Sequence, residues 1–142
     1  MTAQINKRTI VYRNLKTGEY FVQPYTIGPI AASEFGEPTV IQSHEIRTKI
    51  ADAVLNNLDK FGKESYDRMR AIVRNDKQQM AFLKEHLGVS VSQGQSGELV
   101  IYALHREGGG MVGSDEDTFV LSKEEIPHKL AATIAEAFRR AT

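Results

Sequence analysis

Several short, mainly apolar runs of the chain are rich in β-branched and aromatic residues, which predicts β-strands. Clusters of Gly, Asn and Ser separate the runs, as expected for strands joined by turns. The strands are expected at 9–12, 19–25 and 39–41 in the first part of the chain and at 89–91, 99–104 and 118–121 in the second. Residues 99–104 are six apolar residues in succession, which is typical of a central strand covered on both faces.

A helix is predicted after the third strand of each set, because apolar residues there recur at steps of three and four. Ser43 and Ser122 are natural N-caps for these helices, and Ser122 forms a capping box with Glu125 three residues later. The apolar stripes consist of Ile46, Ile50, Ala53, Val54, Leu58 and Phe61 in the first helix and Leu130, Ile134, Ala137 and Phe138 in the second.

The two sets resemble each other when the chain is shifted by 79 residues. Residues 17–22 then align with 96–101, and one further residue of shift aligns the two helices. A duplicated strand–turn–strand–loop–strand–helix unit would explain this repeat, although two unrelated segments of this kind can also be similar by chance. We therefore expect a single domain, 1–142. Its repeat-like halves are expected at 9–61 and 89–140, and a helical connector at 62–88 joins them.

The predicted elements favour an α+β fold with a mostly antiparallel or mixed sheet of about six strands and three or four helices. In the connector, 64–74 and 76–87 are expected to be helical, as one broken helix or two short ones. Gly88 is the expected C-terminal cap of this segment.

Composition excludes several classes of protein. The 142 residues suffice for one domain that buries about two thirds of its unfolded surface. The absence of cysteine excludes a disulfide scaffold, a thiol nucleophile and cysteine-bound zinc. The 18 basic and 18 acidic residues balance, which gives no support for nucleic-acid or membrane-surface binding. No apolar run reaches the roughly 18 residues of a membrane span, and residues 1–8 are polar, so we expect a cytoplasmic protein.

Charge is nevertheless unevenly distributed. Residues 60–84 carry a net charge of +4, and residues 98–125 carry −5. Solvated surface is the ordinary explanation for both. The alternative is that the acidic run Asp115, Glu116 and Asp117 faces a basic protein, because acidic patches steer the association of cationic partners. We therefore predict a partner-binding surface formed by Asp115, Glu116 and Asp117, with Glu107, Glu124 and Glu125 as further candidates.

Local signals for catalysis or cofactor binding are weak. The four histidines lack the spacing of a zinc site, so we expect neither a metal nor a cofactor. Gly108–Gly110 follows a strand but does not lead into a helix N-terminus with a phosphate-binding pattern, so a hairpin or crossover loop is favoured. His105, Arg106 and Glu107 at its entrance are either a catalytic cluster or solvated residues at the end of a strand.

The strand–Ser–helix segment that ends each half, together with the sequence Phe82–Val89 between them, is similar to a known family. The order of these segments resembles the immunity proteins of bacterial contact-dependent growth inhibition, which are small cytoplasmic α/β proteins. The resemblance implies a non-enzymatic antitoxin that binds the C-terminal domain of a cognate toxin, often a nuclease, and occludes its active or substrate-binding surface. The family has no catalytic residues to carry over.

Three hypotheses on function follow. The first is an immunity protein that binds a basic toxin domain through the acidic residues, without direct contact to nucleic acid or membrane. The second is a small ligand-binding protein or enzyme that uses His105, Arg106 and the Gly108–Gly110 loop. The third is a structural subunit of an oligomer.

Overall fold

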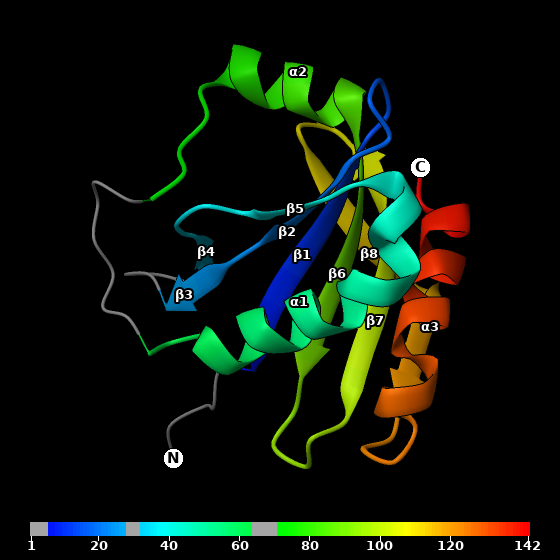
Figure 1. The fold of residues 1–142 in the computed structure, drawn as a ribbon. Coiled ribbons are helices and arrows are strands. Elements are labelled where there is room, and N and C mark those ends of the chain that lie inside the picture. Colours follow the sequence, from blue (N-terminus) through cyan, green and yellow to red (C-terminus); the bar gives the residue numbers. More distant parts are fainter. Residues whose placement is uncertain (1–5, 28–31, 64–70) are drawn as a thin grey trace.

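The computed structural model describes residues 6–27, 32–63 and 71–142 (Figure 1). In these ranges the chain forms strands, three α-helices and one 3₁₀ turn. The strands are β1 (Lys7–Asn14), β2 (Tyr20–Gln23), β3 (Tyr25–Ile27), β4 (Ala32–Glu34), β5 (Thr39–Ile41), β6 (His86–Gln93), β7 (Leu99–Glu107) and β8 (Gly110–Leu121). The 3₁₀ turn is Ser43–Glu45, and the helices are α1 (Ile46–Lys60), α2 (Asp76–Glu85) and α3 (Ile126–Arg140).

Six strands form one sheet in the order β5-β2-β1-β6-β7-β8, and β3 pairs with β4 in a separate hairpin. Every pair of neighbouring strands is antiparallel. Helices α1 and α3 lie side by side against one face of the large sheet, and α2 lies across one end of the strands (Figure 1). The predicted α+β fold with a sheet of about six strands is therefore confirmed, with a wholly antiparallel sheet.

The two halves of the chain contribute equivalent elements to this sheet. Strands β1 and β6 pair at the centre, β2 and β7 lie next to them, and β5 and β8 form the two edges. Strand β6 begins 79 residues after β1, and α3 begins 80 residues after α1, which are the shifts that align the sequence. The arrangement is that of a strand–strand–strand–helix unit present twice, whereas a duplication in the history of the sequence stays a prediction.

The main core lies between the sheet and the two long helices. Ile50, Val54 and Leu58 of α1 are at most 1% exposed. Leu130 and Ile134 of α3 are equally buried. They pack on the strand residues that point to the same face: Val11, Val22, Val89, Val91, Leu99 and Ile101. Burial of each such side chain contributes about 1.5–3 kcal/mol, so this layer is the main source of stability.

A smaller apolar cluster lies on the opposite face of the sheet. Ile10, Tyr12 and Leu104 are buried there, and Phe82 of α2 packs against them. Along β7, in contrast, the residues that point to this face between Leu99 and Leu104 are only half-buried. The prediction that this strand is covered on both faces is therefore wrong over most of its length.

The starts of α1 and α3 lie a few residues later than the two serines predict. Ser43 begins the 3₁₀ turn, and its side chain caps no helix. Ser122 and Glu125 do form the reciprocal hydrogen bonds of the predicted capping box: the Glu125 N–H donates to Ser122 Oγ at 3.3 Å, and the Ser122 N–H donates to Glu125 Oε1 at 3.1 Å. This box closes a turn ahead of α3, which begins at Ile126.

The connector is less helical than predicted. Residues 64–70 of the predicted helix at 64–74 lie outside the described residues, and residues 71–75 are not helical. Helix α2 follows, with Asn75 as N-cap in a capping box with Gln78. Gly88 is not a helix cap but the third residue of β6, because the chain passes directly from α2 into that strand. In the described parts of the chain, none of the helices is long and apolar enough to cross a membrane.

Candidate functional site

The acidic residues 115–117 lie in a bulge of the edge strand β8. Regular pairing with β7 stops at Tyr102 and Thr118. It resumes at Leu104 and Gly113, so residues 114–117 lie opposite a single residue of β7. Such irregularities bend an edge strand and change the direction of its side chains. We call residues 114–117 the acidic bulge.

The side chains of Thr118, His105 and Arg140 hold the acidic bulge in place. The Thr118 hydroxyl donates to the Ser114 carbonyl oxygen at 2.7 Å and closes the bulge on itself. His105 Nε2 lies 2.7 Å from Asp117 Oδ2, and because a carboxylate only accepts, this nitrogen donates. Arg140 Nη1 lies 3.6 Å from the other oxygen of Asp117. Asp117 is thus an internal anchor of the bulge, with a side chain that is 22% exposed.

Asp115 and Glu116 have the opposite role, because both are exposed on the surface of the bulge. In the described part of the chain neither carboxylate forms an ion pair. The structure therefore divides the predicted acidic run into two free carboxylates and one that holds the backbone behind them.

The further predicted candidates lie apart from one another. Glu107 is exposed at the end of β7, next to the hairpin. Glu124 is exposed in the turn before α3, which lies near the start of β7. Eight residues of strand at about 3.3 Å each separate the two ends of β7, so these carboxylates do not form one patch. Glu125 is paired with Lys129 at 2.9 Å, and this hydrogen bond, together with those from Ser122, lowers the pKa of Glu125 to about 2.

The residues of the alternative, catalytic interpretation do not converge on a cavity. His105 Nδ1 lies 2.8 Å from the Thr142 hydroxyl, so both ring nitrogens are engaged. Arg106 donates to the Leu83 carbonyl oxygen at 3.0 Å. The glycines at 108–110 form the hairpin between β7 and β8, with Gly108 at a φ of +59°. A hairpin is one of the two loop types that the sequence favoured, and it places these glycines in open space at the surface.

A polar groove runs beside the acidic bulge, on the face of the sheet opposite α1 and α3. It has a volume of about 570 Å³ and includes Asp115 of the bulge. Ser90 lines it with a buried hydroxyl that has no hydrogen-bond partner among the described residues, and the same holds for the Arg8 Nε. The lining residues are Arg8, Ser90, Ser92, Tyr102, Leu104, Met111, Gly113, Ser114 and Asp115. Sequence patterns did not identify this groove. Arg8, Ile10 and Tyr12 occupy every second position of β1, however, and this spacing could have shown that the strand has a second, partly polar face.

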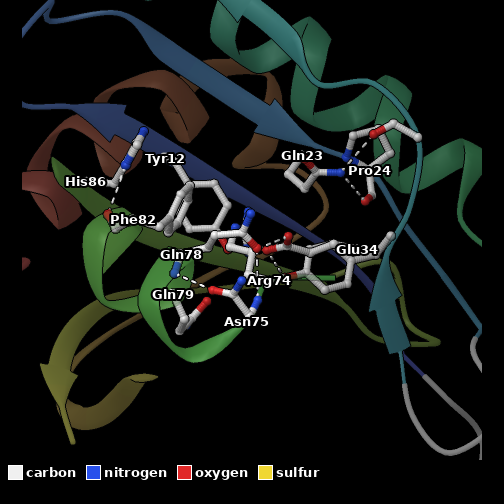
Figure 2. Close-up of polar contacts among 12 residues, drawn as sticks. Tyr12, Gln23, Pro24, Glu34, Arg74, Asn75, Gln78, Gln79, Phe82 and His86 are labelled. Carbon is white, nitrogen blue, oxygen red and sulfur yellow. Dashed lines mark hydrogen bonds and ion pairs between the residues drawn. The ribbon is translucent and has the colours of Figure 1, made fainter. Parts of the chain in front are cut away.

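On the same face of the sheet, a half-buried ion pair joins the connector to β4 (Figure 2). Glu34 accepts a hydrogen bond from the Tyr12 hydroxyl at 2.5 Å and pairs with Arg74 Nη1 at 3.0 Å. The Tyr25 hydroxyl also donates to Glu34, at 3.3 Å. Arg74 in turn lies over the Phe82 ring of α2, 3.9 Å from its centroid. We call Tyr12, Tyr25, Glu34 and Arg74 the Glu34 cluster.

The Glu34 cluster keeps its phenols protonated. Burial raises the pKa of Tyr12, and the neighbouring Tyr25 and Glu34 raise it further. Burial and the Glu34 charge likewise raise the pKa of Tyr25. The two hydroxyls can therefore serve as donors to the carboxylate over the whole physiological range, which favours a structural role for this cluster.

The basic residues of the connector have different surroundings in the structure. Of its arginines, Arg68 and Arg70 lie outside the described residues, and Arg74 is used within the Glu34 cluster. Lys77 and Lys84 are exposed on α2.

Within the described ranges, no group of three His, Asp or Glu side chains is placed to hold a metal ion.

Comparison with known proteins supports the fold and leaves the function open. No family model matches this sequence, and no curated protein matches it. Among solved structures, a protein of unknown function from Neisseria meningitidis is similar, with a TM-score of 0.73 and 14% sequence identity. The match covers the whole of both chains. At this identity the likeness shows the fold alone, and the chain thus shares its complete α+β architecture with that protein.

Proposed function

We propose that this chain is an immunity protein that acts in the bacterial cytoplasm, where it binds the C-terminal domain of a cognate toxin and occludes its active or substrate-binding surface. The proposal rests on the resemblance seen in the sequence and on one structural observation. That observation is the acidic bulge, which presents two exposed carboxylates on a backbone held by internal contacts.

A fixed acidic edge suits recognition of a basic protein. Asp115 and Glu116 need not be ordered on binding, because Asp117, His105 and Thr118 already hold the bulge, and preorganisation lowers the cost of association. Exposed charges of one sign steer a partner of the opposite sign and increase the association rate. The chain as a whole is neutral, so this steering depends on the local patch and not on the net charge.

The polar groove gives the same partner a second point of contact. Ser114 and Asp115 belong to both the acidic bulge and the groove, so a protein bound at the bulge covers the groove mouth. The partly exposed polar side chains of Arg8, Ser92 and Tyr102 at the groove could then hydrogen-bond with groups of the partner.

The test starts from the reading frame directly upstream of this chain, which the proposal predicts to encode a secreted protein with a basic C-terminal domain, and uses that domain as the toxin. We expect one-to-one binding, and rescue of growth when both are expressed together. The variant Asp115→Asn/Glu116→Gln should slow association by about tenfold at low salt and weaken its salt dependence, because steering contributes about 10–10³-fold to such rates. The matched control Glu37→Gln/Asp52→Asn removes two exposed carboxylates elsewhere and should leave the rate nearly unchanged.

Stopped-flow measurements between low and high salt distinguish the outcomes. Equal association rates for the two double variants would refute the role of the acidic bulge. No binding and no growth rescue by the unaltered chain would refute the immunity function itself.

A further inference from the structure

A second cavity lies on the helix side of the sheet, away from the acidic bulge. It is a cleft of about 270 Å³ between the first turn of α1, the C-terminal half of α3 and the adjoining ends of β1 and β2. Its lining residues are Arg13, Tyr20, Ile46, Arg47, Ala131, Ile134, Ala135, Phe138 and Arg139. We call it the arginine cleft, because its charged lining residues are all arginines.

The floor of the arginine cleft is apolar and rigid. Tyr20 and Phe138 meet edge to face with ring centroids 5.2 Å apart, and Ile134 beside them is only 1% exposed. These side chains belong to the main core, so the floor is formed before any ligand arrives. A preformed floor with two aromatic rings suits a flat or branched apolar group.

The arginines of the cleft have few internal partners. Arg13 lies over the Tyr20 ring at 5.4 Å from its centroid, and its buried Nε has no hydrogen-bond partner in the described part of the chain. Arg47 is exposed and forms no ion pair within the described residues. Arg139 is paired with Glu136 at 2.6 Å, and that carboxylate is also shared with Arg140.

The nearest acidic groups do not neutralise the cleft. Glu45, just before α1, pairs with Lys49, and Glu136 is engaged by the arginines of α3. Helix α1 has no acidic residue in its first turn, and Glu45 at its N-cap is the residue already paired with Lys49. Arg13 and Arg47 have no carboxylate partner among the described residues, so the local field in the cleft favours an anion.

We infer that the arginine cleft binds a compact organic anion: an oxyanion held between Arg13 and Arg47, attached to an aromatic or branched apolar group that rests on Tyr20 and Phe138. Guanidinium groups pair with carboxylate and phosphate oxygens in the same forked geometry, so both acids fit this chemistry. The volume of the cleft limits the apolar part to about one ring, since ligand sites for larger molecules occupy about 300–1,000 Å³. This inference does not depend on the proposed function, because the acidic bulge contributes no residue to the cleft.

The probes are phenyl phosphate and benzoate, with inorganic phosphate and benzyl alcohol as partial ligands. Amide chemical shifts of the full chain are followed during each titration. We expect at least one of the two aromatic acids to shift residues around Arg13, Arg47 and Phe138 and to saturate, with inorganic phosphate and benzyl alcohol at least tenfold weaker. The tighter aromatic acid identifies the preferred oxyanion.

Charge-neutral variants decide whether the arginines carry the binding. Arg47 is exposed, so Arg47→Gln should fold normally. Arg47→Gln and Arg13→Gln should each lower the affinity for the aromatic acid by about tenfold or more, as expected for loss of a charge-assisted pair. The matched control Lys77→Gln removes one exposed positive charge on α2 and should leave the affinity unchanged. The inference is overturned if neither aromatic acid binds, if inorganic phosphate binds as tightly, or if the control weakens binding as much as Arg47→Gln.

Discussion

Replacing Tyr12 with phenylalanine tests the physical account of the Glu34 cluster. The Tyr12 hydroxyl donates to Glu34 Oε1 at 2.5 Å, and the Glu34 side chain is only 11% exposed. A hydrogen bond to a charged group contributes about 1.5–3 kcal/mol, so Tyr12→Phe should lower the free energy of unfolding by that amount at neutral pH. Arg74 and Tyr25 still hold Glu34 in the variant, so we expect it to fold.

The cost of Tyr12→Phe should shrink at high pH. In the folded chain the pKa of Tyr12 is raised by burial and by its neighbours, whereas in the unfolded chain this phenol ionises near its ordinary pKa of 10.0. A raised folded pKa contributes stability that is fully present below the unfolded pKa and is lost as pH rises above it. At pH 11, ionisation of this phenol in the unfolded chain lowers the free energy of unfolding of the parent protein by about 1.4 kcal/mol. The Tyr12→Phe variant has no phenol at this position, so its free energy of unfolding is not lowered in this way.

Urea unfolding followed by circular dichroism between pH 7 and 11 measures both effects. The difference in free energy of unfolding between the parent chain and Tyr12→Phe should shrink by about 1.4 kcal/mol between pH 8 and 11. Ile10→Val is the control, because it alters the same apolar cluster, costs about 0.5–1.5 kcal/mol and leaves every phenol in place. Its curve should stay parallel to that of the parent, and a parallel curve for Tyr12→Phe as well would refute the reasoning.

Two further predictions concern other parts of the fold. A Cβ at Gly88 would lie 2.9 Å from Met111 Sδ and 3.0 Å from Leu104 Cδ1, and because both atoms end flexible side chains that can shift, Gly88→Ala should lower the free energy of urea unfolding by only about 1 kcal/mol. The cost should fall in a Met111→Ala background, and an unchanged cost there would contradict the clash. For Glu125, carboxyl NMR titration should give a pKa of about 2, moving towards 4.5 in Lys129→Ala because the hydrogen bond from Lys129 is its main cause. The stability that ionised Glu125 contributes should accordingly be lost as pH falls from about 4.5 to about 2, and a titration unaffected by Lys129→Ala would exclude that cause.

The strands and long helices could be predicted from the sequence because their signals are local. Periods of two and of three to four residues reflect one buried face each, and the main core of Val11, Val89, Ile50 and Ile134 has that pattern. Gly88 was misjudged for a different reason. A glycine after a helical pattern normally marks a helix end, but here the side chains of Leu104 in β7 and Met111 in β8 lie over the glycine and leave little room for a Cβ.

The candidate site was predictable only in part, because its geometry depends on pairing between strands. The sequence identifies an acidic run at 115–117, but nothing local indicates that it lies opposite a single residue of β7. Nor does it indicate that His105 draws Asp117 inward while its two neighbours stay exposed. The two cavities have the same difficulty, since each collects residues from three or four elements that are distant in the chain.

The two halves share a core and differ at the surfaces proposed to bind. The edge strand of the first half, β5, has three residues, whereas its counterpart β8 has twelve and contains the acidic bulge. On the sheet face opposite α1 and α3, α2 and the Glu34 cluster cover one end, whereas the polar groove stays open over β6, β7 and β8. The shared elements form the sheet and its helix layer, and their regular packing leaves room only for the small arginine cleft. We therefore expect the proposed partner to contact parts that break the symmetry, among which the acidic bulge has two exposed carboxylates.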